Sequence, residues 1–375
     1  MNIKEIAEIK RRFNAEKSNI SRVRGCCINE KKEIISTFDQ SLNLMSLEES
    51  EEVLSLLKKS LSGSLGRNIF DIGFTNNQVL DSDEHRLLTA LRSSRLADDE
   101  AVNQLFDIIR ESYVSEGNYL ILLASDAYDV PAYSLDGANK GDSKGIYTYI
   151  LCSICPVKMT KSTLGYRMVE HQLKNNTPDW VIAPPQAGFL FPAFDGRTAN
   201  IYNALFYTKD TADNRQELVE ALFKSTVPMP AAQQKQAFGT LIRDTIADDL
   251  SLDVVKAVQE QIGSMIDEHK ALKDPEPLVI SKQTVSDLLR SCGVDDNRVE
   301  SFAEGFDDTF GAKAQVLPEN LVTLKQFSVK TPDVSVRLAA DAANMVETRI
   351  IDGQKYILIR ADGIVEVNGV EISIS

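Results

Sequence analysis

The C-terminal end of the chain is rich in hairpin turn pairs. These are Asp352-Gly353, Asp362-Gly363 and Asn368-Gly369. Such pairs favour two-residue hairpin turns, because both central residues of the turn take a positive φ. The segments around them are dense in valine and isoleucine, which is typical of strands; they are 346–351, 356–359, 364–367 and 370–374. The sequence therefore predicts a C-terminal antiparallel β-meander and excludes an all-helical fold. An exposed edge of such strands would tend to pair with another chain, so we expect the meander to pack on the rest of this chain or on a second subunit.

The first 210 residues mix helical and strand patterns. Ser46 and Glu49 form a capping box that predicts the start of one helix. Helices are expected at 2–14, 46–61, 83–96 and 98–113. Strands are expected at 20–28, 33–38, 69–74, 118–125, 146–155, 180–183, 188–194 and 202–207. The segment 126–145, rich in Asp and Gly, predicts a loop. Strands and long helices do not alternate regularly, so we expect an antiparallel sheet packed with helices rather than a parallel doubly wound sheet.

The middle of the chain is predicted to form a helical block. Helices are expected at 214–224, 231–247, 252–272, 282–292 and 295–310. The predicted fold class is α+β, with three parts: residues 1–210 as an α+β domain, 211–315 as a helical subdomain, and 316–375 as the β-meander.

Composition excludes several classes of protein. The chain has 375 residues, of which 43% are hydrophobic and 26% charged, so a fibrous or wholly disordered chain is excluded. No apolar run approaches the length that a membrane helix needs, and residues 1–13 lack the apolar block of a secretory leader. Its five cysteines do not make a disulfide scaffold. We therefore expect a cytoplasmic protein with no membrane partner.

Charge is distributed unevenly along the chain. The net charge is -14, which disfavours broad binding to nucleic acid, since phosphates repel an acidic protein. Residues 1–32, however, contain nine basic and four acidic residues. A basic patch on an acidic body would contact phosphates, although the same side chains could simply be solvated. The candidate nucleic-acid-binding residues are Lys10, Arg11, Arg12, Arg22 and Arg24, with Arg67 as a weaker candidate.

Residue patterns that could support catalysis or metal binding are weak. Cys152 and Cys155 have redox spacing, but they lie on a predicted strand, where positions three apart face opposite sides. The pair Asp126 and Asp129 could bind a metal or transfer protons, although the same residues are common in turns. The Gly-rich segment 62–68 is better explained as a helix end than as a phosphate loop. The histidines His85, His171 and His269 show no ligand spacing, so we expect no metal site and no cofactor.

Several stretches resemble the domain of unknown function 4317 family of uncharacterised bacterial proteins. They are Ile-Ser-Arg-Val-Arg-Gly-Cys-Cys at 20–27, Ser-Leu-Ser-Gly-Ser-Leu-Gly at 60–66, Gly-Asn-Tyr-Leu-Ile-Leu-Leu at 117–123, Asp-Ala-Tyr-Asp-Val-Pro at 126–131, Tyr-Ile-Leu-Cys-Ser-Ile-Cys-Pro at 149–156, Gly-Phe-Leu-Phe-Pro-Ala-Phe at 188–194 and Val-Glu-Thr-Arg-Ile-Ile-Asp-Gly at 346–353. The resemblance covers nearly the whole chain and implies no function.

The order of elements is also remotely similar to the bacterial nucleoid-associated protein family. The shared features are, in order, a helix that ends in a Gly-rich turn at 62–66, paired helices, apolar strands at 117–125 and 146–155, an aromatic strand at 188–194 and a run of helices. The tail follows at 321–336, with Leu321, Leu324 and Phe327 before Val334-Ser-Val336. This chain departs from the family in the insertion 126–145 and in an added C-terminal hairpin. That family binds nucleoids and brings no catalytic residue to this chain.

These observations favour a non-enzymatic protein that resembles nucleoid-associated proteins and contacts DNA or a DNA-bound protein. One alternative is a hydrolytic or metal-dependent enzyme that uses Asp126 and Asp129, with Cys152 or Cys155. Another is a structural protein that forms a homo-oligomer through the C-terminal meander.

Overall fold

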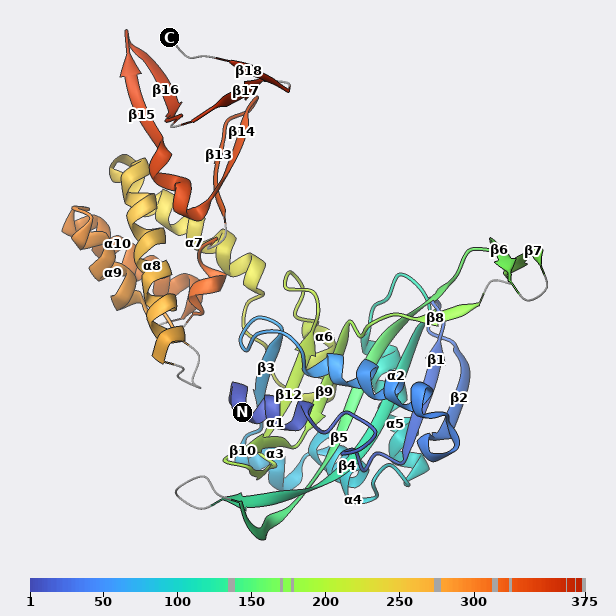
Figure 1. Cartoon of the computed structure of the whole chain (residues 1–375). Coiled ribbons are helices and arrows are strands. Elements are labelled where there is room, and N and C mark those ends of the chain that lie inside the picture. Colours follow the sequence, from blue (N-terminus) through green and yellow to red (C-terminus); the bar gives the residue numbers. More distant parts are fainter. Residues whose placement is uncertain are drawn as a thin grey trace. The chain divides into compact units, whose positions relative to one another are not determined.

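The computed structural model divides the chain into two compact units, Met1–Pro230 and Ala231–Ser375 (Figure 1). It describes residues 1–375 except 134–138, 169–170, 177–178, 273–277, 312–315, 324–325, 362, 368 and 373–375. The predicted boundaries at 210 and 315 stay predictions. Each unit is described by itself below.

An eight-stranded antiparallel sheet forms the centre of the first unit, with strand order β2-β1-β4-β5-β9-β12-β3 and β8 paired to β5. Its strands are β1 (Arg22–Ile28), β2 (Ile34–Ser41), β3 (Ile69–Gly73), β4 (Tyr119–Tyr133), β5 (Asn139–Met159), β8 (Trp180–Ile182), β9 (Ala187–Phe191) and β12 (Asn203–Thr208). Two short pairs lie outside the sheet: β6 (Thr163–Arg167) with β7 (Gln172–Asn176), and β10 (Ala193–Asp195) with β11 (Thr198–Asn200).

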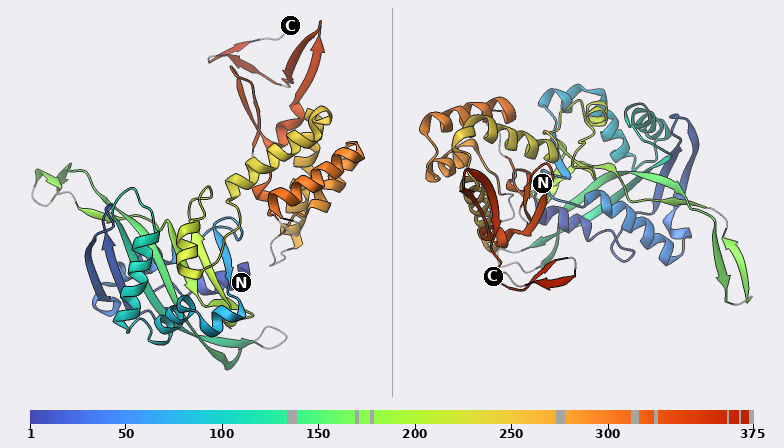
Figure 2. Two further views of the ribbon diagram at one scale, coloured as in Figure 1. Left: turned by 180° about the vertical axis from the view of Figure 1, so that it is seen from behind. Right: turned by 90° about the horizontal axis from the view of Figure 1, so that it is seen from above.

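Helices cover both faces of this sheet. On one face lie α1 (Ile3–Lys10) and α2 (Leu47–Lys58), which share an apolar core with Leu122, Tyr149 and Leu190 of the strands. On the other face lie α4 (Asp83–Ser93), α5 (Asp99–Ser112) and α6 (Gln216–Phe223), with the short α3 (Asn76–Asp81) beside them. Figure 1 shows α2 in front of the sheet, and the view from behind shows α5 and α6 there instead (Figure 2, left). The expected antiparallel sheet packed with helices is confirmed.

Local sequence signals explain where these helices begin. The Ser46 hydroxyl accepts a hydrogen bond from the Glu49 amide at 3.2 Å, and the Glu49 carboxylate accepts one from the Ser46 amide at 2.8 Å. The predicted capping box is therefore confirmed. The helix ends in a 3-10 turn, Lys59–Leu61, followed by Gly63 and Gly66, whose φ angles of 116° and 71° favour glycine. The interpretation of 62–68 as a helix end is confirmed.

The expected loop at 126–145 is wrong. Strands β4 and β5 continue through most of this segment as one long hairpin, with Asp126 opposite Tyr149 and Val130 opposite Gly145. The register shifts at Pro131, where a strand tolerates a residue without an amide donor. Asp and Gly suggested a loop because they are poor strand formers, but pairing with the long partner strand overrides this local preference.

The second unit contains a helical bundle and C-terminal hairpins. Its helices are α7 (Ala231–Ile246), α8 (Leu252–Leu272), α9 (Lys282–Ser291) and α10 (Asp296–Phe310), as the sequence predicted. They enclose a core of Phe238, Ile262, Leu289, Phe302 and Phe306. The hairpins are β13 (Gln326–Lys330) with β14 (Ser335–Ala339), β15 (Val346–Ile351) with β16 (Gln354–Ile359), and β17 (Val365–Val367) with β18 (Val370–Ile372).

The predicted turn at Asp352-Gly353 is confirmed, as are the C-terminal antiparallel hairpins. Asp352 and Gly353 have φ angles of 51° and 77°, as the predicted turn requires. Within the described residues, however, β16 does not pair with β17, so the hairpins do not form one continuous meander. The Arg360 amide bonds to the Met345 carbonyl, which extends the β15–β16 pair before the chain leaves it. Asp362 and Asn368 of the other two turns, and Leu324 of the tail motif, lie outside the described residues.

Candidate nucleic-acid interface

Helix α1 presents three of the candidate cations in succession. Asn2 and Glu5 form a capping box at its start, and the buried Ile6 and Ile9 hold it on the sheet. Lys10 ends the helix, and Arg11 and Arg12 follow it directly. Because consecutive residues point in different directions around a helix end, the three side chains meet different surroundings.

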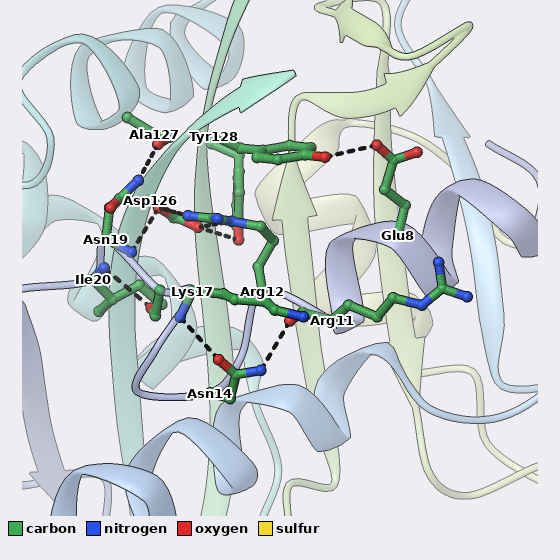
Figure 3. A network of polar contacts seen from close by, with 12 residues as sticks. Glu8, Arg11, Arg12, Asn14, Lys17, Asn19, Ile20, Asp126, Ala127 and Tyr128 are labelled. Atoms are coloured by element: carbon green, nitrogen blue, oxygen red, sulfur yellow. Dashed lines mark hydrogen bonds and ion pairs between the residues drawn. The ribbon is translucent and has the colours of Figure 1, made fainter. Parts of the chain in front are cut away.

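Arg12 is bound to the protein itself. Its guanidinium donates to the Asp126 carboxylate over 3.3 Å and 3.5 Å and lies over the Tyr128 ring, 4.8 Å from the centroid (Figure 3). Asp126 is 1% exposed and also accepts from the Asn19 amide at 3.2 Å and the Tyr149 hydroxyl at 3.1 Å. The two charges balance each other inside the fold, so this pair fastens the segment after α1 to strand β4.

Arg22 and Arg24, both on β1, are also paired. Arg22 forms an ion pair with Asp39 of the neighbouring strand. Arg24, whose side chain is 12% exposed, binds the Asp99 carboxylate at 2.7 Å and the Leu96 carbonyl at 3.2 Å. These contacts tie β1 to β2 and to the start of α5. Three of the six candidate residues therefore form ion pairs within the first unit, which neutralise their charges.

The remaining candidates lack such partners. Among the described residues, no carboxylate forms an ion pair with Lys10, Arg11 or Arg67. The exposed Arg11 side chain points the opposite way from Arg12 (Figure 3). Lys10 lies close to Lys58, the last residue of α2, and burial together with the charge of Lys58 lowers the pKa of the Lys10 ammonium. We call Lys10, Arg11 and Lys58 the α1–α2 cationic cluster.

One carboxylate within electrostatic range of Arg11 already binds other residues. Glu8 of α1 binds the Arg197 guanidinium at 2.8 Å and accepts from the Tyr128 hydroxyl at 2.8 Å. Burial raises the pKa of Glu8, but the hydrogen bonds from Arg197 and Tyr128 outweigh it, so the pKa lies below its ordinary value. Arg11 also lowers it, which places Arg11 within reach of the Glu8 charge. Because Glu8 forms its ion pair with Arg197, Arg11 affects Glu8 only through its charge and forms no ion pair with it.

Sequence reasoning did not identify Lys58 or Glu8 as site residues, and it weighed Arg197 only as part of a run that favours a turn. The helix predicted over 46–61 would end near Lys58, but no local pattern indicates that the charge of Lys58 acts on Lys10. The pairing of Glu8 with Arg197 joins residues from distant parts of the chain, so no spacing rule could have found it.

The geometry gives no support to catalysis at the carboxylates. Asp126 and Asp129 are three positions apart on a strand, and the Asp126 oxygens are occupied by Arg12, Asn19 and Tyr149. Asp129 accepts a hydrogen bond from the Ser143 hydroxyl. In the part of the chain that the structure describes, no group of three His, Cys, Asp or Glu residues is arranged to hold a metal ion.

The cysteines are core residues. Cys152 packs in the core on the α5 face and Cys155 in the core on the α2 face, as strand alternation predicted. Burial raises the pKa of the Cys155 thiol to about 12 and that of Cys26 to about 11. Neither thiol would form a reactive thiolate near neutral pH.

His85 is a core residue, although it lies on a helix rich in charged residues. It is 4% exposed, its Nε2 lies 2.9 Å from the Ile201 carbonyl oxygen, and its ring packs edge-on against Phe74 and Phe191. The charged helix surface suggested exposure, but this residue lies on the side of α4 that faces the sheet.

Comparison with known proteins identifies a family. The family model described as Domain of unknown function (DUF4317) matches residues 1–370. The search of curated proteins found no match. Among the described residues, no helix is both long enough and apolar enough to cross a membrane.

Proposed function

Because the chain belongs to the DUF4317 family, whose description gives no activity, we propose its function from the arrangement of its charges. The proposed function is that of a cytoplasmic, non-enzymatic protein that binds DNA through phosphate contacts at the α1–α2 cationic cluster. The order of elements, which remotely resembles that of nucleoid-associated proteins, would favour the same function.

One observation carries this proposal. Lys10 and Lys58 come from different helices, and the charge of Lys58 helps to lower the pKa of Lys10, so the two like charges lie within electrostatic range of each other. A lysine in the last turn of a helix is favourable for that helix, but among the described residues neither lysine forms an ion pair that would offset this repulsion. A phosphate oxygen between them would remove the repulsion, and Arg11 would add donors suited to phosphate.

The acidic remainder of the chain restricts where DNA can approach. With a net charge of -14, most of the surface repels a polyanion, so DNA would meet the protein only at a local cationic face. The sequence-predicted donors Arg12, Arg22 and Arg24 contribute little to this face, since they are bound to Asp126, Asp39 and Asp99.

The experiment is fluorescence anisotropy of a labelled duplex of about 30 base pairs, titrated with the full-length protein at several salt concentrations. The test variant is Lys10→Gln/Arg11→Gln/Lys58→Gln. The control is Lys31→Gln/Lys209→Gln/Lys224→Gln, which changes the net charge equally at exposed sites elsewhere in the first unit.

The test variant should bind at least about tenfold more weakly than the wild-type protein at low salt, while the control stays within about twofold. Equal losses in both variants would mean that only net charge matters, and would overturn the assignment of the site. If the wild-type protein does not bind DNA at low salt, direct contact is wrong. The acidic surface would then favour a basic, DNA-bound protein as the partner, which a pull-down would identify.

A further inference from the structure

An exposed hairpin arm extends from the sheet of the first unit. It consists of β6 and β7 together with β8 and the end of β5 that pairs with it. Figures 1 and 2 show the β6–β7 hairpin standing clear of the sheet in each view. An isolated two-stranded hairpin is marginally stable in water, so an arm of this kind gains from a partner surface.

The hairpin has one apolar and one polar face. Tyr166 lies opposite Leu173, and Leu164, two residues from Tyr166, shares their face. The other face carries Gly165 and Lys174, which are also opposite each other. Leu164 is 66% exposed and Met168, in the turn, is 76% exposed. The apolar face therefore lies open to solvent.

The base of the arm also exposes apolar side chains. Met159 lies opposite Trp180, and Ile182 shares their face, where its partner Val157 packs on the core. Trp180, the only tryptophan of the chain, is 51% exposed. Exposed apolar side chains gathered on one arm are typical of an interaction site.

The same unit contains a hollow of complementary character. It has a volume of about 640 Å³ between the end of α1 and the start of α2. Leu47, which is 69% exposed, supplies most of its apolar surface, and the buried Phe13 contributes only its edge. Glu48, Glu51 and Glu52 supply its charge, and no basic residue among those described lines it. By contrast, residues 157–182 contain four basic and two acidic residues, so the sequence of the arm has a positive net charge, opposite to that of the hollow.

We propose that the arm of one chain docks in this acidic hollow of a second copy, and that two chains exchange arms reciprocally. The apolar face of the hairpin would cover Phe13 and Leu47, and the long side chains of Lys158 and Lys161 would reach the glutamates. Reciprocal exchange about a two-fold axis uses each arm and each hollow once, so the assembly closes as a dimer instead of growing into a fibre.

The area available agrees with a dimer. Full burial of one apolar side chain removes roughly 60–120 Å² of surface at about 25 cal/mol per Å². The arm has seven exposed large apolar side chains on the faces described, so they offer about 400 Å²; they are Met159, Leu164, Tyr166, Met168, Leu173, Trp180 and Ile182. Two arms and the two surfaces that they cover would bury about 1,600 Å², which is the usual size of a specific interface.

The test measures the oligomeric state and the surroundings of Trp180 in the same samples. Full-length protein is studied by light scattering and sedimentation over a range of concentrations, together with tryptophan emission and its quenching by iodide. We expect a dimer whose formation shifts Trp180 emission to shorter wavelength and protects it from iodide. Since Trp180 is the only tryptophan, the emission reports on the arm alone.

Two variants test the arm itself. Tyr166→Asn/Leu173→Asn should be monomeric, with its circular dichroism unchanged, because both side chains are exposed. Its melting temperature should equal that of dilute, monomeric wild-type protein, since dimer formation stabilises the folded state. Thr163→Asn/Gln172→Asn, on the polar face of the same hairpin and without added charge, is the control and should still dimerise.

A charge exchange tests the hollow. Glu48→Lys/Glu51→Lys/Glu52→Lys should weaken dimerisation at least about tenfold, and adding Lys158→Glu/Lys161→Glu should restore part of the loss. The proposal is overturned by a monomer at about 100 µM, or by a dimer that the arm variant leaves intact. It is equally wrong if Trp180 stays open to iodide in the dimer, or if its emission shifts only when lipid vesicles are added to a monomer.

Discussion

Lys10 and Arg12 are two positions apart in the sequence, yet their charges have opposite roles. Arg12 is balanced by the buried Asp126, whereas Lys10 faces the like charge of Lys58. The charge pattern of residues 1–32 could predict that cations gather here. It could not predict which of them are neutralised, because their carboxylate partners lie outside this segment, on β2, β4 and α5.

Removing the buried carboxylate should destabilise the first unit. Asp126→Asn leaves Arg12 half-buried without an opposite charge, so we expect a loss of about 3 kcal/mol in the free energy of unfolding. Urea denaturation followed by circular dichroism measures it. Asp129→Asn, at an exposed position three residues further along, should change stability by less than about 0.5 kcal/mol. Equal effects would mean that the Arg12–Asp126 pair is not structural.

Lys10→Met should stabilise the protein while weakening DNA binding. Because burial and Lys58 lower the pKa of Lys10 in the folded state, the unfolded chain holds this proton more tightly. The charged form therefore costs stability near neutral pH, and the cost disappears as pH rises from the lowered pKa towards the ordinary value of 10.5. After allowance for solvent screening, we expect a gain of about 0.5 kcal/mol at neutral pH.

Thermal melts at several pH values measure this gain. The difference between Lys10→Met and the wild-type protein should narrow as the pH approaches 10.5, the ordinary lysine value. A variant that is less stable than the wild-type protein at neutral pH would show that the Lys10 charge stabilises the fold, contrary to our account.

At the scale of elements, the local signals worked where a short-range interaction decides the structure. The Ser46–Glu49 capping box and the Asp352-Gly353 turn depend on backbone groups within a few residues, so the sequence was sufficient to place them. The extent of β4 and β5 depends on pairing across the hairpin, and it was missed. The β6–β7 hairpin was missed as well, since it has no dense apolar run to mark it.

Gly188 tests the packing of the sheet. A Cβ at this position of β9 would lie 2.4 Å from the Cys152 carbonyl oxygen of β5, and backbone in the middle of a sheet cannot move away. We expect Gly188→Ala to cost about 2–3 kcal/mol in chemical denaturation. Gly117→Ala, where nothing lies within 4 Å of the added atom, is the control. A neutral Gly188→Ala would show that β5 and β9 pack less closely than described.

At the scale of the whole molecule, the fold class was predictable and the function was not. Alternation of apolar residues, helix caps and turn pairs predicted an antiparallel sheet with helices, a helical block and C-terminal hairpins, and all three are confirmed. The cationic cluster depends on the arrangement of α1 and α2 on one face of the sheet, which no local pattern encodes. Charge counts identified the relevant segment of the sequence, but they also included three arginines whose charges are neutralised by ion pairs within the first unit.

The most direct test of this account is the salt dependence of duplex binding for the wild-type protein and the cluster variant. Each phosphate contact adds about 0.9 to the slope of log K against log salt concentration, so losing Lys10, Arg11 and Lys58 should lower the slope by about 2–3. That decrease, absent from the control variant, is the result that we predict. A wild-type slope near zero, or equal slopes in the wild-type protein and the cluster variant, would contradict the claim that these three residues contact DNA phosphates.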